Sequence, residues 1–203
     1  MSSVFKRSRG VIAAVSLLAS IFAPTAWATT VRPLSFDEIA AQADVIALVA
    51  TVNVRADWQT SAQGKHIVTT VTFRLERTLK GQIGQEFQLE FLGGNIAGIV
   101  MEVDSMPEFH VGGRDVLFLS ANRNSVSPIV GLFQGRFRVE GDRAAGTEQI
   151  LTNSGRPFIA AAATGGMNRL LSVPSSAAGG PVSYSQFEAL VRQSVALGPA
   201  VTR

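Results

Sequence analysis

KHIVTTVTFRLERTLK, residues 65–80, is the stretch that decides the fold. Its apolar residues share one parity and most of its polar residues take the other, which is the period of two typical of a β-strand. The pattern therefore predicts a strand with one buried and one solvent-facing side. The predicted inward side chains are Ile67, Val71, Phe73, Leu75 and Leu79, and the outward ones are Thr70, Thr72, Arg74, Glu76 and Thr78.

Further strand patterns lie on both sides of this stretch. DVIALVATVNVR (44–55) is rich in Val and Ile and predicts a central strand whose first half is buried on both faces. The polar residues 57–64 predict a loop before the next strand. Other strands are predicted at 86–91 (with Phe87, Leu89 and Phe91 inward), 96–103, 114–121, 129–140 (interrupted at its glycines) and 148–152.

A helix is predicted at each end of the strands. Ser35 and Glu38 match a capping box and predict a short helix at 36–42. Ser185 and Glu188 match a second box, which predicts a helix at 184–198 that ends at Gly198 and Pro199. The apolar face of this second helix is expected to pack on the strands rather than serve a partner; its residues are Phe187, Leu190, Val191, Val195 and Leu197.

Strands without intervening helices predict a mainly β, antiparallel architecture. We expect a small closed OB-like barrel over residues 29–156 rather than a sandwich, because several strands are apolar on both sides or bent by glycine. Residues 157–183 are rich in Ala, Gly, Ser and Pro, and they predict an irregular linker to the last helix.

Residues 1–28 have the layout of a secretory signal peptide. Lys6, Arg7 and Arg9 precede an apolar run from Val11 to Phe22, and Ala26-Trp27-Ala28 forms a small-residue cleavage site. The run is shorter than the roughly 20 residues of a membrane span. The sequence therefore predicts an exported chain, periplasmic or secreted, without a stable membrane anchor once the signal is removed.

Charge and cysteine content narrow the function classes. Three of the 18 basic residues and none of the 15 acidic ones lie in the predicted signal, which leaves 15 of each. A neutral chain lacks the basic face expected of a nucleic-acid-binding protein. The absence of cysteine excludes thiolate nucleophiles, zinc–thiolate sites and disulfides, so stability must come from packing.

Four segments carry a family resemblance in their order along the chain: ADVIALVATV (43–52), TLKG (78–81), AGIVMEV (97–103) and DVLFL (115–119). Over about Ser35–Val139 the chain resembles the netrin-like module, the OB-fold barrel of the tissue inhibitors of metalloproteinases. GLFQGRF (131–137) is similar to a segment of exported bacterial proteins. The inhibitors chelate the protease zinc with an N-terminal cysteine, whereas this chain has none and is expected to begin at Thr29. The resemblance therefore implies the fold of these inhibitors more strongly than their activity against metalloproteinases.

FLGGNIAGIVMEVDSMPEFHVGG (91–113) holds the sharpest candidate site. Gly93 and Gly98 have the spacing of a phosphate loop, but Ile99 replaces its lysine, so Gly93-Gly94-Asn95 is predicted to be a hairpin connection instead. Asp104, Glu108 and His110 could supply oxygen and imidazole ligands to a divalent metal ion. A solvated loop is the favoured interpretation, since four-ligand spacing is absent, and no cofactor is predicted.

Four other side chains are candidates for a functional role. Trp58 lies in the predicted polar loop and is either a cap over one end of the barrel or a binding anchor. His66 is expected on the surface, with no nucleophile tied to it. Arg136 and Arg138 flank Phe137 and are expected on a solvated strand face, although basic residues beside an aromatic can bind single-stranded nucleic acid.

The leading hypothesis is a non-enzymatic exported module that binds another envelope or extracellular protein. Its expected contact residues are Thr29, Thr30, Val31, Arg32 and Trp58, together with the 104–110 connection. Two alternatives stay open: an inhibitor or regulator of a secreted metalloproteinase, by analogy with the resembled family, and a hydrolase that uses paired carboxylates.

Overall fold

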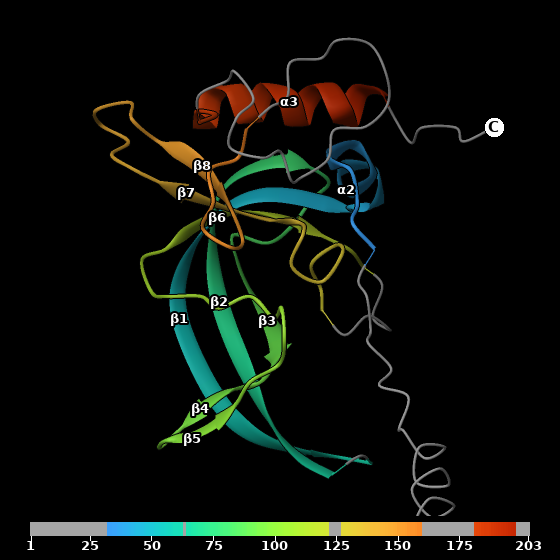
Figure 1. The fold of residues 1–203 in the computed structure, drawn as a ribbon, viewed down its shortest axis with the longest axis vertical. Helices are drawn as coiled ribbons and strands as arrows, with labels where there is room; N and C mark the ends of the chain where they lie inside the picture. The colour runs from blue at the N-terminus through green and yellow to red at the C-terminus, as the bar shows by residue number, and fades with distance from the viewer. Residues whose placement is uncertain (1–31, 63, 122–126, 160–180, 198–203) are drawn as a thin grey trace, which may run out of the picture. The chain divides into compact units, whose positions relative to one another are not determined.

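The computed structural model describes residues 32–62, 64–121, 127–159 and 181–197. All of these residues belong to one unit, which begins at Arg32. The unit is mainly β, with an antiparallel sheet in the order β3-β2-β1-β6-β7-β8 and a separate hairpin, β4-β5 (Figure 1). The strands of the sheet are β1 (Val45–Ser61), β2 (Gly64–Lys80), β3 (Glu86–Leu92), β6 (Arg114–Leu119), β7 (Arg136–Glu140) and β8 (Gln149–Thr152). The hairpin consists of β4 (Gly94–Ile96) and β5 (Ile99–Met101), and the helices are α2 (Phe36–Gln42) and α3 (Tyr184–Leu197).

The sheet is antiparallel as predicted, but the expectation of a closed barrel is wrong. Among the described strands, β3 and β8 are the two edges and do not pair with each other. Closure requires every strand to be hydrogen-bonded on both sides. The later strands are too short for that, since β7 has 5 residues and β8 has 4, against 17 in each of β1 and β2.

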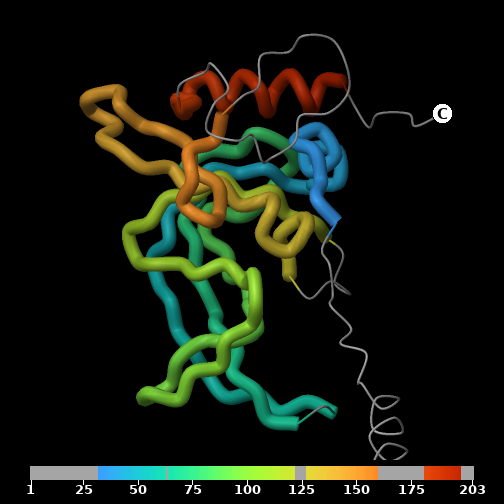
Figure 2. The backbone as a smooth tube through the Cα atoms, viewed as in Figure 1, coloured from blue at the N-terminus to red at the C-terminus, as the bar shows by residue number. Residues whose placement is uncertain are grey.

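A long hairpin, β1–β2, forms the middle of the sheet. The two strands pair from Ile46–Lys80 to Ser61–Gly64, whereas β6 pairs with β1 only from Val45 to Ala50. The hairpin therefore extends beyond the rest of the sheet, as the tube trace shows (Figure 2). The predicted loop at 57–64 is wrong, because strand β1 continues to Ser61. Those residues are polar since this end of the hairpin is exposed, not because the backbone is irregular.

The two faces of the sheet carry separate apolar cores. On one face, α2 and α3 cover a core centred on Phe36, whose ring lies 5.4–5.9 Å from the rings of Phe118, Phe137, Phe158 and Phe187. The second core lies on the other face, around Phe73, Phe91 and Phe109. The inward row of β2 is confirmed at Ile67, Val71 and Phe73, which are fully buried, and at Leu75, which is half-buried against the second core. It is wrong for Leu79, which packs against the first core after register shifts in this part of the hairpin. Thr72, predicted to face outward, is only 5% exposed. The first half of β1 is buried on both faces, also as predicted.

The short helix α2 begins and ends where the sequence predicts. Ser35 Oγ accepts from the Glu38 amide at 3.2 Å, and Glu38 Oε2 accepts from the Ser35 amide at 2.8 Å. These hydrogen bonds, led by the one from the Ser35 backbone and joined by one from Arg32, lower the pKa of Glu38 to about 2. The capping box therefore holds Glu38 ionised.

The C-terminal helix α3 packs on the first core, as expected, but its predicted cap is wrong. Gln186 and Ser183 form the capping box, with the Gln186 side chain accepting from the Ser183 amide at 3.0 Å. Glu188 instead binds Arg77 of β2 at 2.9 Å. Phe187 and Val191 are buried, whereas Leu197 is 72% exposed and does not belong to the apolar face.

Both ends of the predicted linker lie in the first core. Phe158 and Val182 are buried there, and their backbones hydrogen-bond to each other and to Ile150 of β8. Residues 160–180 lie outside the described residues, as does the predicted signal peptide. No helix within the described ranges is long and apolar enough to cross a membrane.

Candidate functional site

A cleft of about 440 Å³ lies between one face of the β1–β3 sheet and the segment 92–110. This volume falls within the roughly 300–1,000 Å³ of small-molecule and side-chain pockets. The cleft is lined by Val54, Ala56, Thr69, Val71, Phe91, Leu92, Gly93, Gly94, Asn95, Val100, Met101, Glu102, Val103, Met106, Pro107, Glu108, Phe109 and His110. Most of these side chains are apolar, so the cleft is suited to an apolar group.

The sheet wall of the cleft depends on an irregularity in β1. The register between β1 and β2 shifts between Thr51 and Asn53, so one extra residue is accommodated there. Such a bulge reverses which residues face a given side of the sheet. Val54 and Ala56, which pair with Val71 and Thr69, therefore face the second core and form the wall.

The β4–β5 hairpin forms the opposite wall at one end. Its turn is Ala97-Gly98, and both residues have positive φ, as two-residue hairpin turns of type I′ require. Thr69 Oγ1 donates to the Gly93 carbonyl at 2.7 Å, which ties the hairpin to β2. Gly94 sits so close to β2 that a Cβ would clash with Thr69 Oγ1. The predicted single strand at 96–103 is thus a hairpin, and Gly93-Gly94 leads into it instead of forming its turn.

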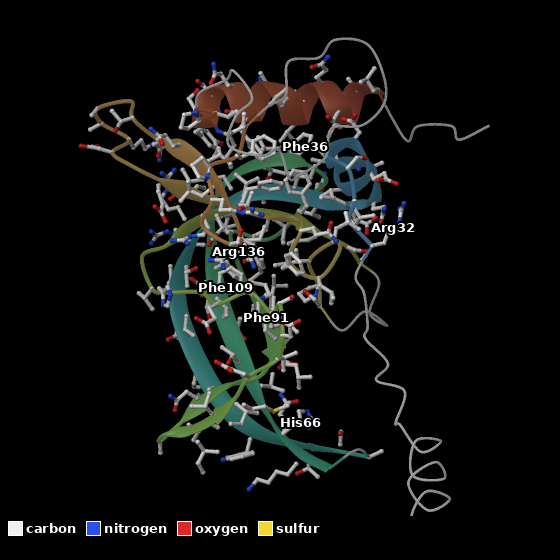
Figure 3. The ribbon with its side chains drawn as sticks, in the orientation of Figure 1. Arg32, Phe36, His66, Phe91, Phe109 and Arg136 are labelled. Carbon is white, nitrogen blue, oxygen red and sulfur yellow. The ribbon has the colours of Figure 1, made fainter. Side chains whose placement is uncertain are left out.

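Phe109 anchors the far end of the cleft-forming segment. Its ring is buried and lies 5.1 Å from Phe73 and 5.0 Å from Phe91, and the Arg136 guanidinium lies 4.2 Å above it (Figure 3). Just beyond, the Gly112 amide donates to the Thr51 carbonyl at 2.9 Å. The segment is therefore held by a buried ring and by backbone pairing, and the cleft between these anchors has a defined shape.

A buried ion pair lies behind Phe109. Arg136 Nε donates to Asp115 Oδ1 at 2.8 Å, and the two side chains are 7% and 2% exposed. Arg136 also donates to Asn153 Oδ1 at 3.1 Å. Burial raises the pKa of Asp115, and the charge and hydrogen bond of Arg136 oppose that rise. The expected solvated position is therefore wrong for Arg136, which binds inward, while Arg138 is half-buried.

The three candidate metal ligands are not brought together. Glu108 and His110 line the cleft and Asp104 lies outside it, and all three side chains are exposed. No group of three or more His, Asp or Glu side chains close enough to hold a metal ion occurs in the described part of the chain. Glu102 also lines the cleft, whereas no Lys or Arg does among the described lining residues. The mouth of the cleft is therefore acidic.

The other predicted contact residues lie away from the cleft or outside the described residues. Thr29, Thr30 and Val31 lie outside the described residues. Arg32 is exposed and pairs with Glu38 at 2.9 Å on the helix side of the sheet. Trp58 is 40% exposed on β1, with Lys65 Nζ 4.6 Å from its ring. Trp58 is two residues after Ala56 in β1, and side chains two apart in a strand point to the same face, so Trp58 lies on the face that carries the cleft.

The remaining candidate, His66, is half-buried near the hairpin end. Its Nδ1 lies 3.2 Å from the Gly64 carbonyl. The sequence missed the wall residues Val54 and Ala56, because their position depends on a bulge in β1. Thr69 was also missed, although it shares the inward parity of Ile67 and Val71 on β2. The inward parity of Val71 was the one available signal for that wall.

Comparison with known proteins finds no matching family model, no matching curated protein and no matching solved structure. The netrin-like resemblance therefore stays a prediction.

Proposed function

We propose that the chain is a protein-binding module and that its cleft receives a bulky apolar side chain of an extended partner segment. The cleft itself is the observation that carries this proposal. Its walls are set by β-pairing and by the Phe109 anchor, and preformed concave apolar surfaces are where binding energy concentrates.

The charge around the cleft indicates the partner's chemistry. Glu102 and Glu108 line it and Asp104 lies near in the sequence, all exposed, without a lining Lys or Arg among the described residues. Acidic rims favour basic partners mainly through association rate and selectivity. The preferred segment is therefore an apolar residue flanked by Lys or Arg.

Exposed apolar side chains beside the cleft support the same proposal. Ile99 is 56% and Val100 is 59% exposed at the β4–β5 hairpin, and Val100 lines the cleft. A partner that covers these side chains would bury more apolar surface next to the pocket. Most of the affinity of an interface comes from a few residues near its centre.

The experiment selects ligands from a displayed library of short random peptides against the purified protein. We expect the enriched peptides to share an apolar residue next to Lys or Arg. The dissociation constant of one selected peptide is then measured by fluorescence anisotropy for the wild type and two variants, Val100→Asp and Val111→Asp.

The two variants form a matched pair. Both valines are exposed, at 59% and 66%, but only Val100 lines the cleft. Val100→Asp should weaken binding by about tenfold or more, the effect of a central interface residue. Val111→Asp should leave it unchanged. Failure to enrich such peptides, or equal effects of the two variants, would contradict the proposal.

A secreted metalloproteinase as partner, and paired-carboxylate hydrolysis, stay predictions that no contact among the described residues favours.

A further inference from the structure

The outer half of β1 has an unpaired edge. Strand β6 pairs with β1 from Val45 to Ala50, and Thr51 is the last residue with a backbone partner on that side, through Gly112 and Gly113 at 2.9 Å each. From Asn53 to Thr60, β1 pairs only with β2 within the described residues. The side chains of Val54 and Ala56 also line the cleft, but the edge consists of backbone groups, and the inference does not rest on the proposed function.

The register fixes which backbone groups of this edge are free. The Ile67 carbonyl accepts from Gly93, and the Leu75 amide donates to Gln85, so the odd residues of β2 bond toward β3. Its even residues must then bond toward β1, where Val68 pairs with Asp57 and Thr70 with Arg55. By the same alternation, the N–H and C=O groups of Val54, Ala56, Trp58 and Thr60 point away from the sheet.

This edge lacks the usual protection against strand addition. Edge strands are commonly blocked by unpaired charge, proline or a covering element. The other sheet edge near the cleft, β3, carries the exposed carboxylates of Glu86 and Glu90. On β1, the two charges at the edge, Arg55 and Asp57, pair with each other at 2.7 Å and cancel.

We propose that a second copy of this chain pairs antiparallel with the β1 edge, about a two-fold axis at Ala56. In that register Ala56 faces Ala56 of the second copy, and Val54 faces Trp58. Both pairs are hydrogen-bonded, because the N–H and C=O groups of Val54, Ala56 and Trp58 point away from the sheet. The intervening pairs set Arg55 opposite Asp57 of the other copy, and symmetry repeats the contact.

Self-complementarity distinguishes this register from its neighbours. Moving the axis by one residue toward the turn sets Asp57 opposite Asp57, and moving it the other way sets Arg55 opposite Arg55. Like charges directly opposite each other are destabilising. Registers that pair even with odd residues lose the hydrogen bonds, since only the even residues present free groups. The Ala56-centred arrangement combines hydrogen bonds, opposite charges and an aromatic–valine pair.

The experiment measures the dimer dissociation constant of the purified protein by sedimentation equilibrium over a range of concentrations. We expect a monomer–dimer equilibrium. Asp57→Arg and Arg55→Asp each create two like-charge contacts, and each should weaken the dimer by about tenfold or more. The double variant Arg55→Asp/Asp57→Arg restores opposite charges in the same register and should return the dissociation constant to within about threefold of the wild type.

Circular dichroism of each variant checks that the monomer stays folded. Ala56→Pro gives an independent test, because proline removes an outward-facing N–H and is tolerated on edge strands. It should abolish the dimer. A protein that stays monomeric at every concentration, single variants that dimerise like the wild type, or a double variant that is not restored would overturn the proposal.

Discussion

The buried pair of Asp115 and Arg136 gives the sharpest prediction about stability. Their charged atoms lie 2.8 Å apart, nearly without solvent contact, and Arg136 also covers the Phe109 ring. Removing one partner of a buried pair leaves the other charge without compensation, which typically costs about 3–5 kcal/mol. Asp115→Asn should therefore lower the free energy of unfolding by about 3–5 kcal/mol, a large part of the total of about 5–15 kcal/mol.

The two partners differ in how they respond to the loss of the other. An arginine side chain cannot lose its proton in a protein, so Arg136 stays charged in Asp115→Asn at any accessible pH. A carboxylic acid can take up a proton. In Arg136→Met the pKa of Asp115 should rise further, because the charge and hydrogen bond that oppose the effect of burial are gone.

This difference gives opposite pH profiles. A carboxyl whose folded pKa lies above its unfolded pKa of about 3.9 binds more protons in the folded state, so stability falls as pH rises between the two values. The destabilisation by Arg136→Met should thus grow by about 1.4 kcal/mol per pH unit over the interval between the pKa of Asp115 in the wild type and in the variant. The destabilisation by Asp115→Asn should instead shrink as pH rises from the unfolded pKa of about 3.9 to the raised pKa of Asp115 in the wild type, because only the wild type loses stability there, and it should be constant above that interval.

Urea unfolding across a pH series measures both effects. The double variant Asp115→Leu/Arg136→Met is the control, since a hydrophobic pair of similar volume in place of a buried ion pair is often neutral or stabilising. It should recover most of the stability that Asp115→Asn loses. Single variants that each cost less than about 1 kcal/mol, the usual limit for exposed pairs, with the same pH profile would show that the pair is solvated.

Three further predictions concern the core, the capping box and the hairpin. Phe36→Ala should cost about 3–5 kcal/mol in urea unfolding, because four other phenylalanine rings pack around this one. The pKa of Glu38 is lowered from 4.5 to about 2, so the wild type should lose the stability contributed by this carboxylate as pH falls through that interval. The Glu38→Gln variant lacks the carboxylate and should not show this loss. The urea midpoint between those pH values tests this. Gly98→Ala should cost about 1–2 kcal/mol for its positive φ alone, and Gly94→Ala should cost more, because its new Cβ would also clash with Thr69; unfolding midpoints compare the two.

Much of the fold could be predicted because it follows from local patterns. Alternation in β2 gave the buried row of Ile67, Val71 and Phe73, and the capping box at Ser35 gave the start of α2. Barrel closure could not be predicted in this way, since it depends on the lengths and registers of strands far apart in the sequence. The hairpin end around Trp58 was mistaken for a loop because polar composition reports exposure, and an exposed hairpin is as polar as a loop.

The candidate site was predicted only in part for the same reason. The stretch 91–113 holds the sharpest candidate in the sequence and does form one side of the cleft, but as a hairpin and an anchored segment instead of a turn, a single strand and a solvated loop. Arg136 was placed on a solvated face because a lone arginine gives no sign of a buried partner. Asp115, on the neighbouring strand, becomes that partner only through the pairing of β6 with β7.

The bulge in β1 explains why the cleft lies where it does. Before Thr51, β1 lies between two strands and two cores, so neither its edges nor its faces are free. After Asn53 the strand has lost β6, and the reversed parity turns Val54 and Ala56 toward the segment 92–110. One inserted residue therefore separates a structural half of the hairpin from a half that exposes both a cleft wall and a free edge. Deleting Val52 should remove the bulge and leave the pairs Thr51–Phe73 and Val54–Val71 unchanged. Val54 and Ala56 should therefore still face the cleft, and both the peptide affinity and the Phe36 core should persist. Loss of peptide binding in a folded variant would contradict this account of the register.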